Sequence, residues 1–170
     1  MLKDTVREYK DIRRLLRPLV RGLVVAVDPS IGSTSSMPGW AAYRAGELVG
    51  SGVLEIDASA ETHRLRYVAL ALAKVYRCYP PDVLVYEDIA PRRYGGGSAH
   101  GHASLLKSVG AILSVPGPDH HLGLRPTQWK RQVRESYVKG DEADAIEMGY
   151  VAVSTAQWVI ENDPPRGYRA

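Results

Sequence analysis

Four acidic side chains in three separate parts of the chain have positions that suit metal chemistry. Asp28 and Glu87 each end an apolar run, and Asp141 and Asp144 lie three residues apart at the expected start of a helix. Like charges within a few ångströms repel each other unless a cation or a proton lies between them. Hard cations such as Mg²⁺ bind carboxylates, and two such ions can promote phosphodiester hydrolysis. The four acids together therefore predict a metal site.

Each part of this set also has a plainer structural interpretation. Asp28 precedes Pro-Ser, a sequence that can simply turn the chain after a core strand. The helix dipole favours acids in a first turn, which accounts for Asp141 and Asp144 without any metal. Asp88 competes with Glu87, because neighbouring residues of a strand face opposite ways. The combination is more specific than any of its parts.

The elements that would position these acids are strands and helices of an α/β fold. The runs 23–28 and 83–87 are apolar on both faces and rich in β-branched residues, as in strands buried within a sheet. Such sheets place chemistry at the carboxyl ends of their strands. Two β-like segments flank Ala45-Gly46 and predict an antiparallel hairpin, so we expect a mixed sheet flanked by helices. The remaining pattern predicts helices over residues 60–78, 102–114, 127–137 and 140–162 and a strand over 121–125.

Length and composition favour one domain with a core, since 45% of the 170 residues are hydrophobic. We expect a domain over residues 22–163, a helical extension over 1–21 and a tail over 164–170. No stretch reaches the roughly 18 to 20 consecutive apolar residues of a membrane span, and no secretory signal is evident. A lone cysteine, Cys78, fits a reducing compartment. We therefore predict a cytoplasmic protein that does not enter a membrane.

The extension over residues 1–21 is basic and amphipathic. It carries seven Lys or Arg and three Asp or Glu, in a chain with a net charge of +3. Apolar side chains recur near the helical period at Val6, Tyr9, Ile12, Leu15 and Leu16. Two interpretations remain open, a solvated helix packed on the domain or an arm that touches DNA. With four acids gathered in one pocket, the remaining surface carries roughly +7, which suits a polyanionic partner.

Several short motifs, in this order along the chain, resemble those of RuvC-type Holliday junction resolvases, with a possible phage-type relationship. The motifs are Asp28-Pro29-Ser30, Gly39-Trp40-Ala41, Tyr86-Glu87, Ser104-Leu105-Leu106-Lys107-Ser108-Val109-Gly110, Arg125-Pro126, Lys130-Arg131-Gln132 and Asp141-Glu142-Ala143-Asp144-Ala145. The resemblance covers roughly residues 23–160 and implies an RNase H-like fold. Residues 1–20 extend beyond the usual start of the family.

The resemblance also implies an activity and its partners. It implies symmetric nicking of four-way DNA junctions by a homodimer that depends on Mg²⁺ or Mn²⁺. By motif, the metal-binding acids are Asp28, Glu87, Asp141 and Asp144, so Glu87 is preferred over Asp88. We expect DNA contacts from Arg92, Arg93, Tyr94, Lys107, Lys130, Arg131 and Lys139. The alternatives are a nuclease of the same fold that acts on flaps, forks or RNA–DNA hybrids, and a non-catalytic nucleic-acid-binding module.

The helix expected over residues 102–114 bears on the dimer. We expect one face of it to pack on the sheet, formed by Leu105, Leu106, Val109, Ile112 and Leu113. Ser104, Ser108 and Ala111 would then form a stripe of small residues at helical spacing. Another helix could approach closely there, so we expect this stripe to contact the second copy.

Overall fold

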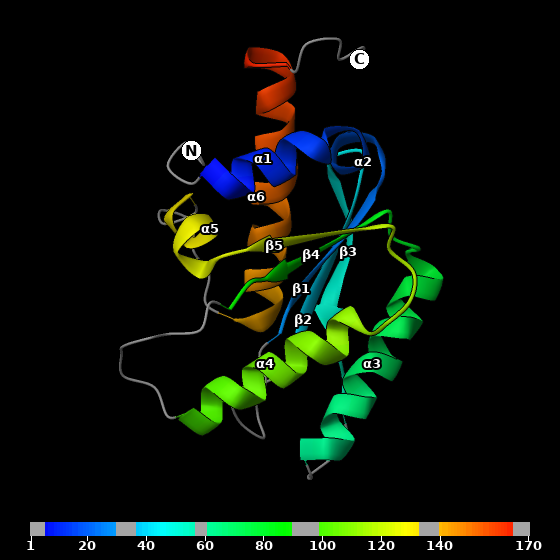
Figure 1. The fold of residues 1–170 in the computed structure, drawn as a ribbon. Coiled ribbons are helices and arrows are strands. Elements are labelled where there is room, and N and C mark those ends of the chain that lie inside the picture. Colours follow the sequence, from blue (N-terminus) through cyan, green and yellow to red (C-terminus); the bar gives the residue numbers. More distant parts are fainter. Residues whose placement is uncertain (1–5, 30–36, 57–60, 90–98, 133–139, 165–170) are drawn as a thin grey trace.

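The computed structural model describes residues 6–29, 37–56, 61–89, 99–132 and 140–164. Its elements are α1 (Val6–Arg14), α2 (Leu16–Arg21), β1 (Leu23–Asp28), β2 (Gly39–Arg44), β3 (Glu47–Val53), α3 (Glu61–Cys78), β4 (Val83–Glu87), α4 (Ala99–Leu113), β5 (His120–Leu124), α5 (Pro126–Gln132) and α6 (Asp141–Asn162). The fold is α/β, as predicted, with helices on both faces of a mixed sheet (Figure 1). In the part of the chain described here, no helix is both long and apolar enough to cross a membrane.

The sheet has the strand order β3-β2-β1-β4-β5. β1 runs antiparallel to β2 and parallel to β4, and β4 runs parallel to β5. The hairpin is confirmed, with Ala45 and Gly46 both at positive φ in its turn. The carboxyl ends of β1, β4 and β5 therefore meet at one edge of the sheet.

Two cores lie on opposite faces of β1, because successive side chains of a strand point to opposite faces. Val24 and Ala26 belong to a core shared with α1, α2, α5 and α6. Val25 and Val27 belong to a second core shared with α3 and α4. Gly149 lets α6 pack closely on the sheet, since a Cβ there would crowd the ring of Tyr43 and the side chain of Ala26.

The expected packing of α4 holds for Ile112, which is fully buried in the core shared with β1, but it is wrong for the two serines and Leu106. Ser108 is fully buried and Ser104 is 8% exposed, whereas Leu106 is 43% exposed. The main partner of α4 among the described elements is α3 rather than the sheet. Small side chains let two helices approach closely, so the serines turn inward and leave Leu106 outside. The predicted small-residue stripe is part of the fold and is not a surface for a second copy.

The N-terminal helices pack on the domain. Ile12 and Leu19 are fully buried and Leu16 is 2% exposed, in the core that also contains α6. The break between α1 and α2 has a local cause in Pro18, which has no N–H for the carbonyl of Arg14 and whose ring clashes with that carbonyl. Of the two interpretations of this segment, a helix packed on the domain describes its buried side. Contact between its exposed side and DNA stays a prediction.

Candidate active site

Asp28 and Glu87 lie side by side at the carboxyl edge of the sheet. In the parallel register, Val27 pairs with Tyr86, so the next residue on each strand is an acid. Asp28 is only 7% exposed and Glu87 is half-buried. The sequence predicted that these two acids would lie together, because each ends an apolar run and parallel neighbouring strands end at the same edge of a sheet.

The first turn of α6 brings Asp141 and Asp144 to the same edge. Gly39 makes this approach possible, because a Cβ at Gly39 would overlap the backbone of Asp141. Gly39 also pairs with Asp28 across β1 and β2, so the helix begins directly over the end of β1. The backbone N–H of Met37 donates a hydrogen bond of 3.2 Å to Oδ2 of Asp141. The start of α6 is thereby fixed relative to the strand-end acids.

Glu142 has a structural role that the sequence reasoning did not assign. The Ser51 hydroxyl on β3 donates a hydrogen bond of 2.7 Å to Oε1 of Glu142. This contact ties the first turn of α6 to the far side of the hairpin. The sequence reasoning separated Asp141 and Asp144 from Glu142 by their spacing, but it gave Glu142 no role beyond an acid that suits a first turn.

The four acids are coupled electrostatically. The pKa of Asp28 is raised from 3.8 to about 8, first by burial and then by the charges of Glu87, Asp144 and Asp141. Burial also raises the pKa of Glu87, and the charge of Asp144 adds to the effect. Asp88 is not among the groups that act on Asp28, so the coupling selects Glu87 of the two adjacent acids. The structure thus gathers the predicted acids, while their role as metal ligands stays a prediction.

Lys130 supplies a cation inside this acid cluster. Its Nζ lies 3.1 Å from Oδ2 of Asp144 and 4.7 Å from the centroid of the Trp129 ring. Its charge lowers the pKa of both Asp28 and Glu87. We predicted Lys130 only as a DNA contact, and its place among the acids was missed. The available signal was topological, because α5 follows β5 and β5 ends at the same edge as β1 and β4.

Trp129 is a second residue that the sequence reasoning missed. Its side chain is fully buried. Its indole N–H lowers the pKa of Glu87, although Nε1 makes no hydrogen bond of ordinary geometry to a described residue. A buried indole N–H usually finds a polar partner.

The oxygen atoms at this edge suit a hard divalent cation. Oδ1 of Asp144 is buried and has no hydrogen-bond partner among the described residues, and an unpaired buried carboxylate oxygen is costly unless something binds it. Carboxylate oxygens are also the donors that Mg²⁺ and Mn²⁺ prefer. Within the described ranges, no three His, Cys, Asp or Glu side chains converge tightly enough to hold one ion in this arrangement. The donor type fits such an ion, and Asp144 is the acid whose unpaired oxygen would hold it.

The remaining predicted DNA contacts are only partly visible. Lys107 is exposed on α4. Arg92, Arg93, Tyr94 and Lys139 lie outside the described residues, as does the side chain of Arg131. The structure therefore leaves these contacts as predictions.

Comparisons with known proteins agree with the fold. No family model matches the sequence, and no curated protein matches it. Among solved structures, Thermus thermophilus RuvC in complex with Holliday junction substrate is similar, with 15% identity and a TM-score of 0.59 over 81% of this chain and 95% of that one. The chain has a RuvC-type fold. A second T. thermophilus RuvC structure aligns with 13% identity and a TM-score of 0.54 over 79% of this chain and 96% of that one.

A yeast protein extends the likeness. The yeast mitochondrial Holliday junction resolvase Ydc2 aligns over 93% of this chain and 97% of its own, with 12% identity and a TM-score of 0.51. The RNase H-like fold expected from the RuvC resemblance is therefore confirmed. At such low identity the likeness concerns the fold, so the activity must be argued from the site.

Proposed function

We propose that this chain is a metal-dependent endonuclease that nicks four-way DNA junctions. The observation that carries the proposal is that β1, β4 and α6 bring Asp28, Glu87, Asp141 and Asp144 to one edge of the sheet, where burial first, and then the charges of the other three acids, raise the pKa of Asp28 to about 8. A cluster of buried acids costs stability unless it serves a ligand. The structural likeness to Holliday junction resolvases, one of them with its junction substrate, supports the choice of substrate.

The four acids would hold Mg²⁺, or Mn²⁺ in its place. When bound, the metal supplies an activated water and neutralises charge on the scissile phosphate. Among the described residues, Lys130 is the cation that acts on these acids, and once freed from Asp144 its ammonium can donate to a phosphate oxygen. Trp129 buries one side of the cluster, which keeps the local dielectric low and strengthens both interactions.

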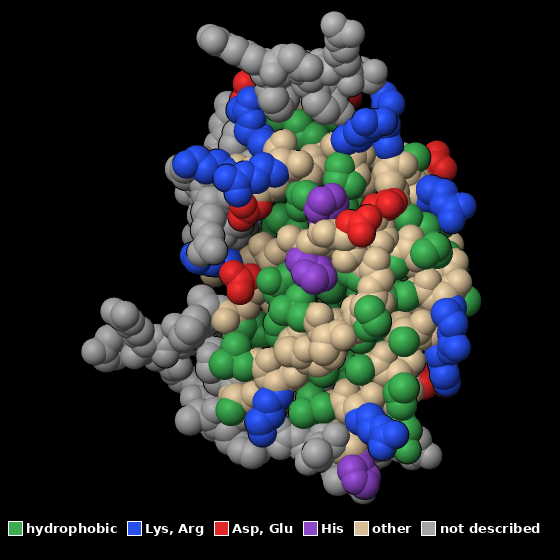
Figure 2. Space-filling view, turned by 45° about the vertical axis from the view of Figure 1, so that its right-hand side comes forward, with side chains coloured by type: hydrophobic (Ala, Val, Ile, Leu, Met, Phe, Trp, Pro, Cys, Tyr) green, Lys and Arg blue, Asp and Glu red, His purple; other side chains and the backbone are tan. Residues whose placement is uncertain are grey.

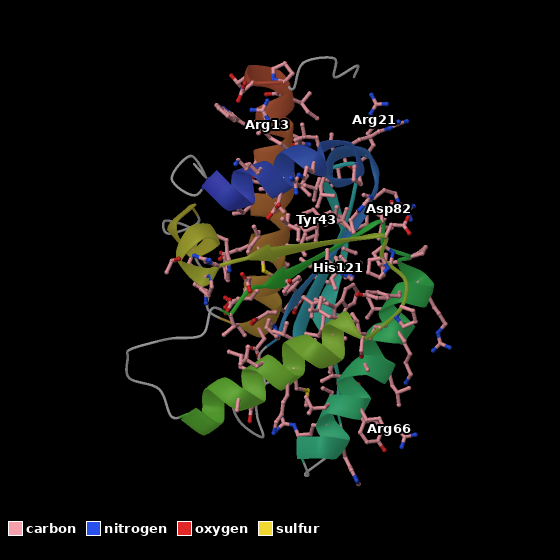
Figure 3. All side chains as sticks on the ribbon, viewed as in Figure 1. Arg13, Arg21, Tyr43, Arg66, Asp82 and His121 are labelled. Atoms are coloured by element: carbon pink, nitrogen blue, oxygen red, sulfur yellow. The ribbon has the colours of Figure 1, made fainter. Side chains whose placement is uncertain are left out.

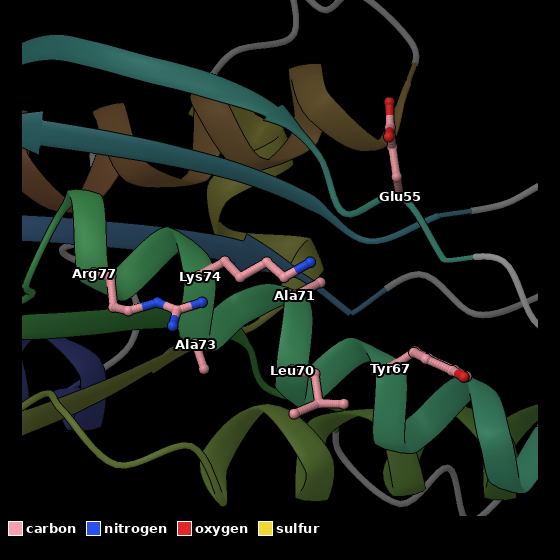
Figure 4. Close-up of a pocket in the computed structure, with 7 residues that line it drawn as sticks. All are labelled: Glu55, Tyr67, Leu70, Ala71, Ala73, Lys74 and Arg77. Atoms are coloured by element: carbon pink, nitrogen blue, oxygen red, sulfur yellow. The ribbon is translucent and has the colours of Figure 1, made fainter.

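Resolution of a junction takes two symmetric cuts, so we propose a homodimer with a two-fold axis. The surface that favours it lies on α3, where Tyr67 is 45% and Leu70 is 49% exposed. These residues line a shallow pocket of about 420 Å³ that Glu55 borders from the segment after β3 (Figure 4). Hydrophobic side chains also reach the surface over the lower part of Figure 2, where α3 and α4 lie. Such exposed apolar area is typical of protein interfaces.

The decisive test of the activity is a substrate panel. Labelled four-way junction, fork, flap, RNA–DNA hybrid and linear duplex are incubated with Mg²⁺ and, separately, with EDTA. We expect cleavage of the junction at paired positions on opposite strands, and none in EDTA. Faster cleavage of forks, flaps or hybrids would favour the alternative nuclease, and junction binding without any cleavage would favour the non-catalytic module.

The dimer is tested at the α3 surface. Leu70→Arg places a charge in the apolar patch, and we expect it to sediment as a monomer that nicks junctions without resolving them. Arg44→Gln, at the exposed end of β2, is a control that should leave the assembly unchanged. A wild-type chain that stays monomeric at all concentrations would contradict the dimer and leave the nuclease proposal intact.

A further inference from the structure

The exposed face of α1 and α2 is entirely basic over residues 10–21. Every residue of that stretch that the structure shows as exposed is a cation, namely Lys10, Arg14, Arg17 and Arg21. Lys10 and Arg14 lie four residues apart on α1, and Arg17 and Arg21 lie four residues apart on α2, so each pair lies on one side of its helix. We call these four residues the basic face. Lys and Arg side chains gather over the upper part of Figure 2, where α1 and α2 lie.

The opposite side of the same helices holds the basic face in place. Ile12, Leu16 and Leu19 are buried in the core with α6, and Nη1 of Arg13 lies 2.9 Å from Oδ2 of Asp163. Because no hydrophobic side chain is exposed between residues 10 and 21, this stretch offers no apolar surface for insertion into a lipid layer. The cations are presented from a fixed position.

Few acids neutralise the basic face. Arg14 makes a 3.9 Å pair with Asp11, but its side chain is 79% exposed, so solvent screens the pair. Lys10, Arg17 and Arg21 form no ion pair with any described residue. In Figure 3 the labelled Arg21 side chain points away from α2. A row of exposed, weakly paired cations attracts a polyanion.

The basic face is far from the acid cluster. α6 joins the two regions, from Asp144 among the acids to Asp163 beside Arg13. At 1.5 Å per residue, the stretch of α6 from Asp144 to Asp163 is about 28 Å long, the rise of about eight base pairs of DNA at 3.4 Å each, and we take it as the scale of the separation. Cations at this distance cannot contact the phosphate that lies at the acids.

We propose that the basic face is a second duplex-binding surface, which holds the phosphate backbone of a DNA arm about eight base pairs from the acids. Its contacts are with phosphates, so they add affinity without sequence preference. The inference rests on the proposed function in one respect, namely that the acid cluster acts on DNA.

The test compares two double variants with the same loss of charge. Arg17→Gln with Arg21→Gln removes half of the basic face, and Arg44→Gln with Arg66→Gln removes two exposed arginines elsewhere. Glutamine keeps good helix propensity, and circular dichroism melting checks that both variants fold as the wild type does. Binding is measured by fluorescence anisotropy in EDTA, over a series of salt concentrations.

The probes are two four-way junctions whose arms are closed by hairpin loops, with arms of about 25 or about 6 base pairs on either side of the eight-base-pair estimate. On the long arms we expect the basic-face variant to bind roughly tenfold more weakly, with a salt slope lower by about 2. On the short arms it should bind as the wild type does. The control variant should change less on both probes.

Three results would overturn the proposal. Equal losses in the two variants would mean that only net charge matters, and a loss on the short arms would place the cations near the acids. If the basic-face variant bound the long-arm junction as tightly as the wild type, DNA would not reach this surface. That result would refute the proposal even if RNA or an acidic protein bound there. Binding in EDTA needs no catalysis. If the basic-face variant bound long arms more weakly but the wild type cleaved no junction, the second duplex-binding surface would be supported and only the nuclease proposal would be refuted.

Discussion

The two charged regions of this molecule differ in how their charges are held. At the acid cluster, carboxylates are buried at the carboxyl edge of the sheet and act on one another, with Lys130 between them. At the basic face, the cations stand in solvent on a helix whose other side is in the core. Coulomb interactions are strong at low dielectric and weak in water. We therefore expect single residues to decide the behaviour of the first region and only summed charge to decide that of the second.

Asp28→Asn should have the largest effect of any single substitution. It removes the most buried acid of the cluster, so Mg²⁺-dependent junction cleavage should fall by about a thousandfold or more. Junction binding in EDTA should be retained or improved, because one charge that repels phosphate is gone. Asp88→Asn is the matched control, one residue beyond the neighbouring strand-end acid, and should keep most of the activity. Both variants are measured by single-turnover cleavage of the junction. If the two substitutions lowered the cleavage rate by equal factors, the proposed function would lose its basis.

The same variant changes how stability depends on pH. A carboxyl whose pKa is raised by folding binds its proton more tightly in the folded state, so wild-type stability in EDTA should fall as pH rises from about 4 to about 8. Asp28→Asn should lose that slope and be more stable near pH 8 by roughly 5 kcal/mol, since the pKa rises by about four units and one unit corresponds to about 1.4 kcal/mol. Added Mg²⁺ should raise the melting temperature of the wild type and not that of the variant. Parallel pH profiles would mean that Asp28 is not strained in the folded protein.

The sequence was sufficient to predict this end of the sheet because strand ends are local features. The apolar runs that stop at Asp28 and Glu87 show where two strands end, and parallel pairing then brings the acids together. The place of Lys130 was not predictable in the same way, since it depends on how α5 turns back after β5. The packing of α4 was mistaken because its sequence is apolar on more than one side, and only the contact with α3 shows that Ser108 faces inward.

Gly39→Ala tests whether the acids must be positioned as well as present. The added Cβ would overlap the backbone of Asp141, so the start of α6 has to move away from β1. A misplacement of about 1 Å can cost about a hundredfold in rate, and we expect a loss of that order in single-turnover cleavage. Gly110→Ala is the matched control, because its Cβ would meet nothing within 4 Å. In α4 it should keep full activity and add about 0.5–1 kcal/mol of stability.

Lys130→Met tests whether the ammonium competes with the metal for the acids. Lys130 is 40% and Asp144 12% exposed, so solvent weakens their pair to about 1 kcal/mol. Without the ammonium, the Mg²⁺ concentration that gives half of the thermal stabilisation should fall roughly fivefold, the factor that such an energy represents. Arg44→Met, at the exposed end of β2, is a comparison with the same loss of charge. An unchanged or higher midpoint for Lys130→Met would show that the lysine does not occupy the place of the ion.

The smallest effect is expected at the ion pair beside the basic face. Arg13 and Asp163 lie 2.9 Å apart, but their side chains are 32% and 52% exposed. Solvent and salt screen such a pair, so a double-mutant cycle with Arg13→Gln and Asp163→Asn should give a coupling free energy of unfolding below about 1 kcal/mol. The coupling should shrink further in high salt, whereas the corresponding cycle for Lys130→Met and Asp144→Asn should change less because that pair is more deeply buried. If the Arg13 pair gives the larger and less salt-sensitive coupling, burial does not separate the two regions as we infer. In that case α1 would be held to α6 by charge as well as by the packing of Ile12, Leu16 and Leu19.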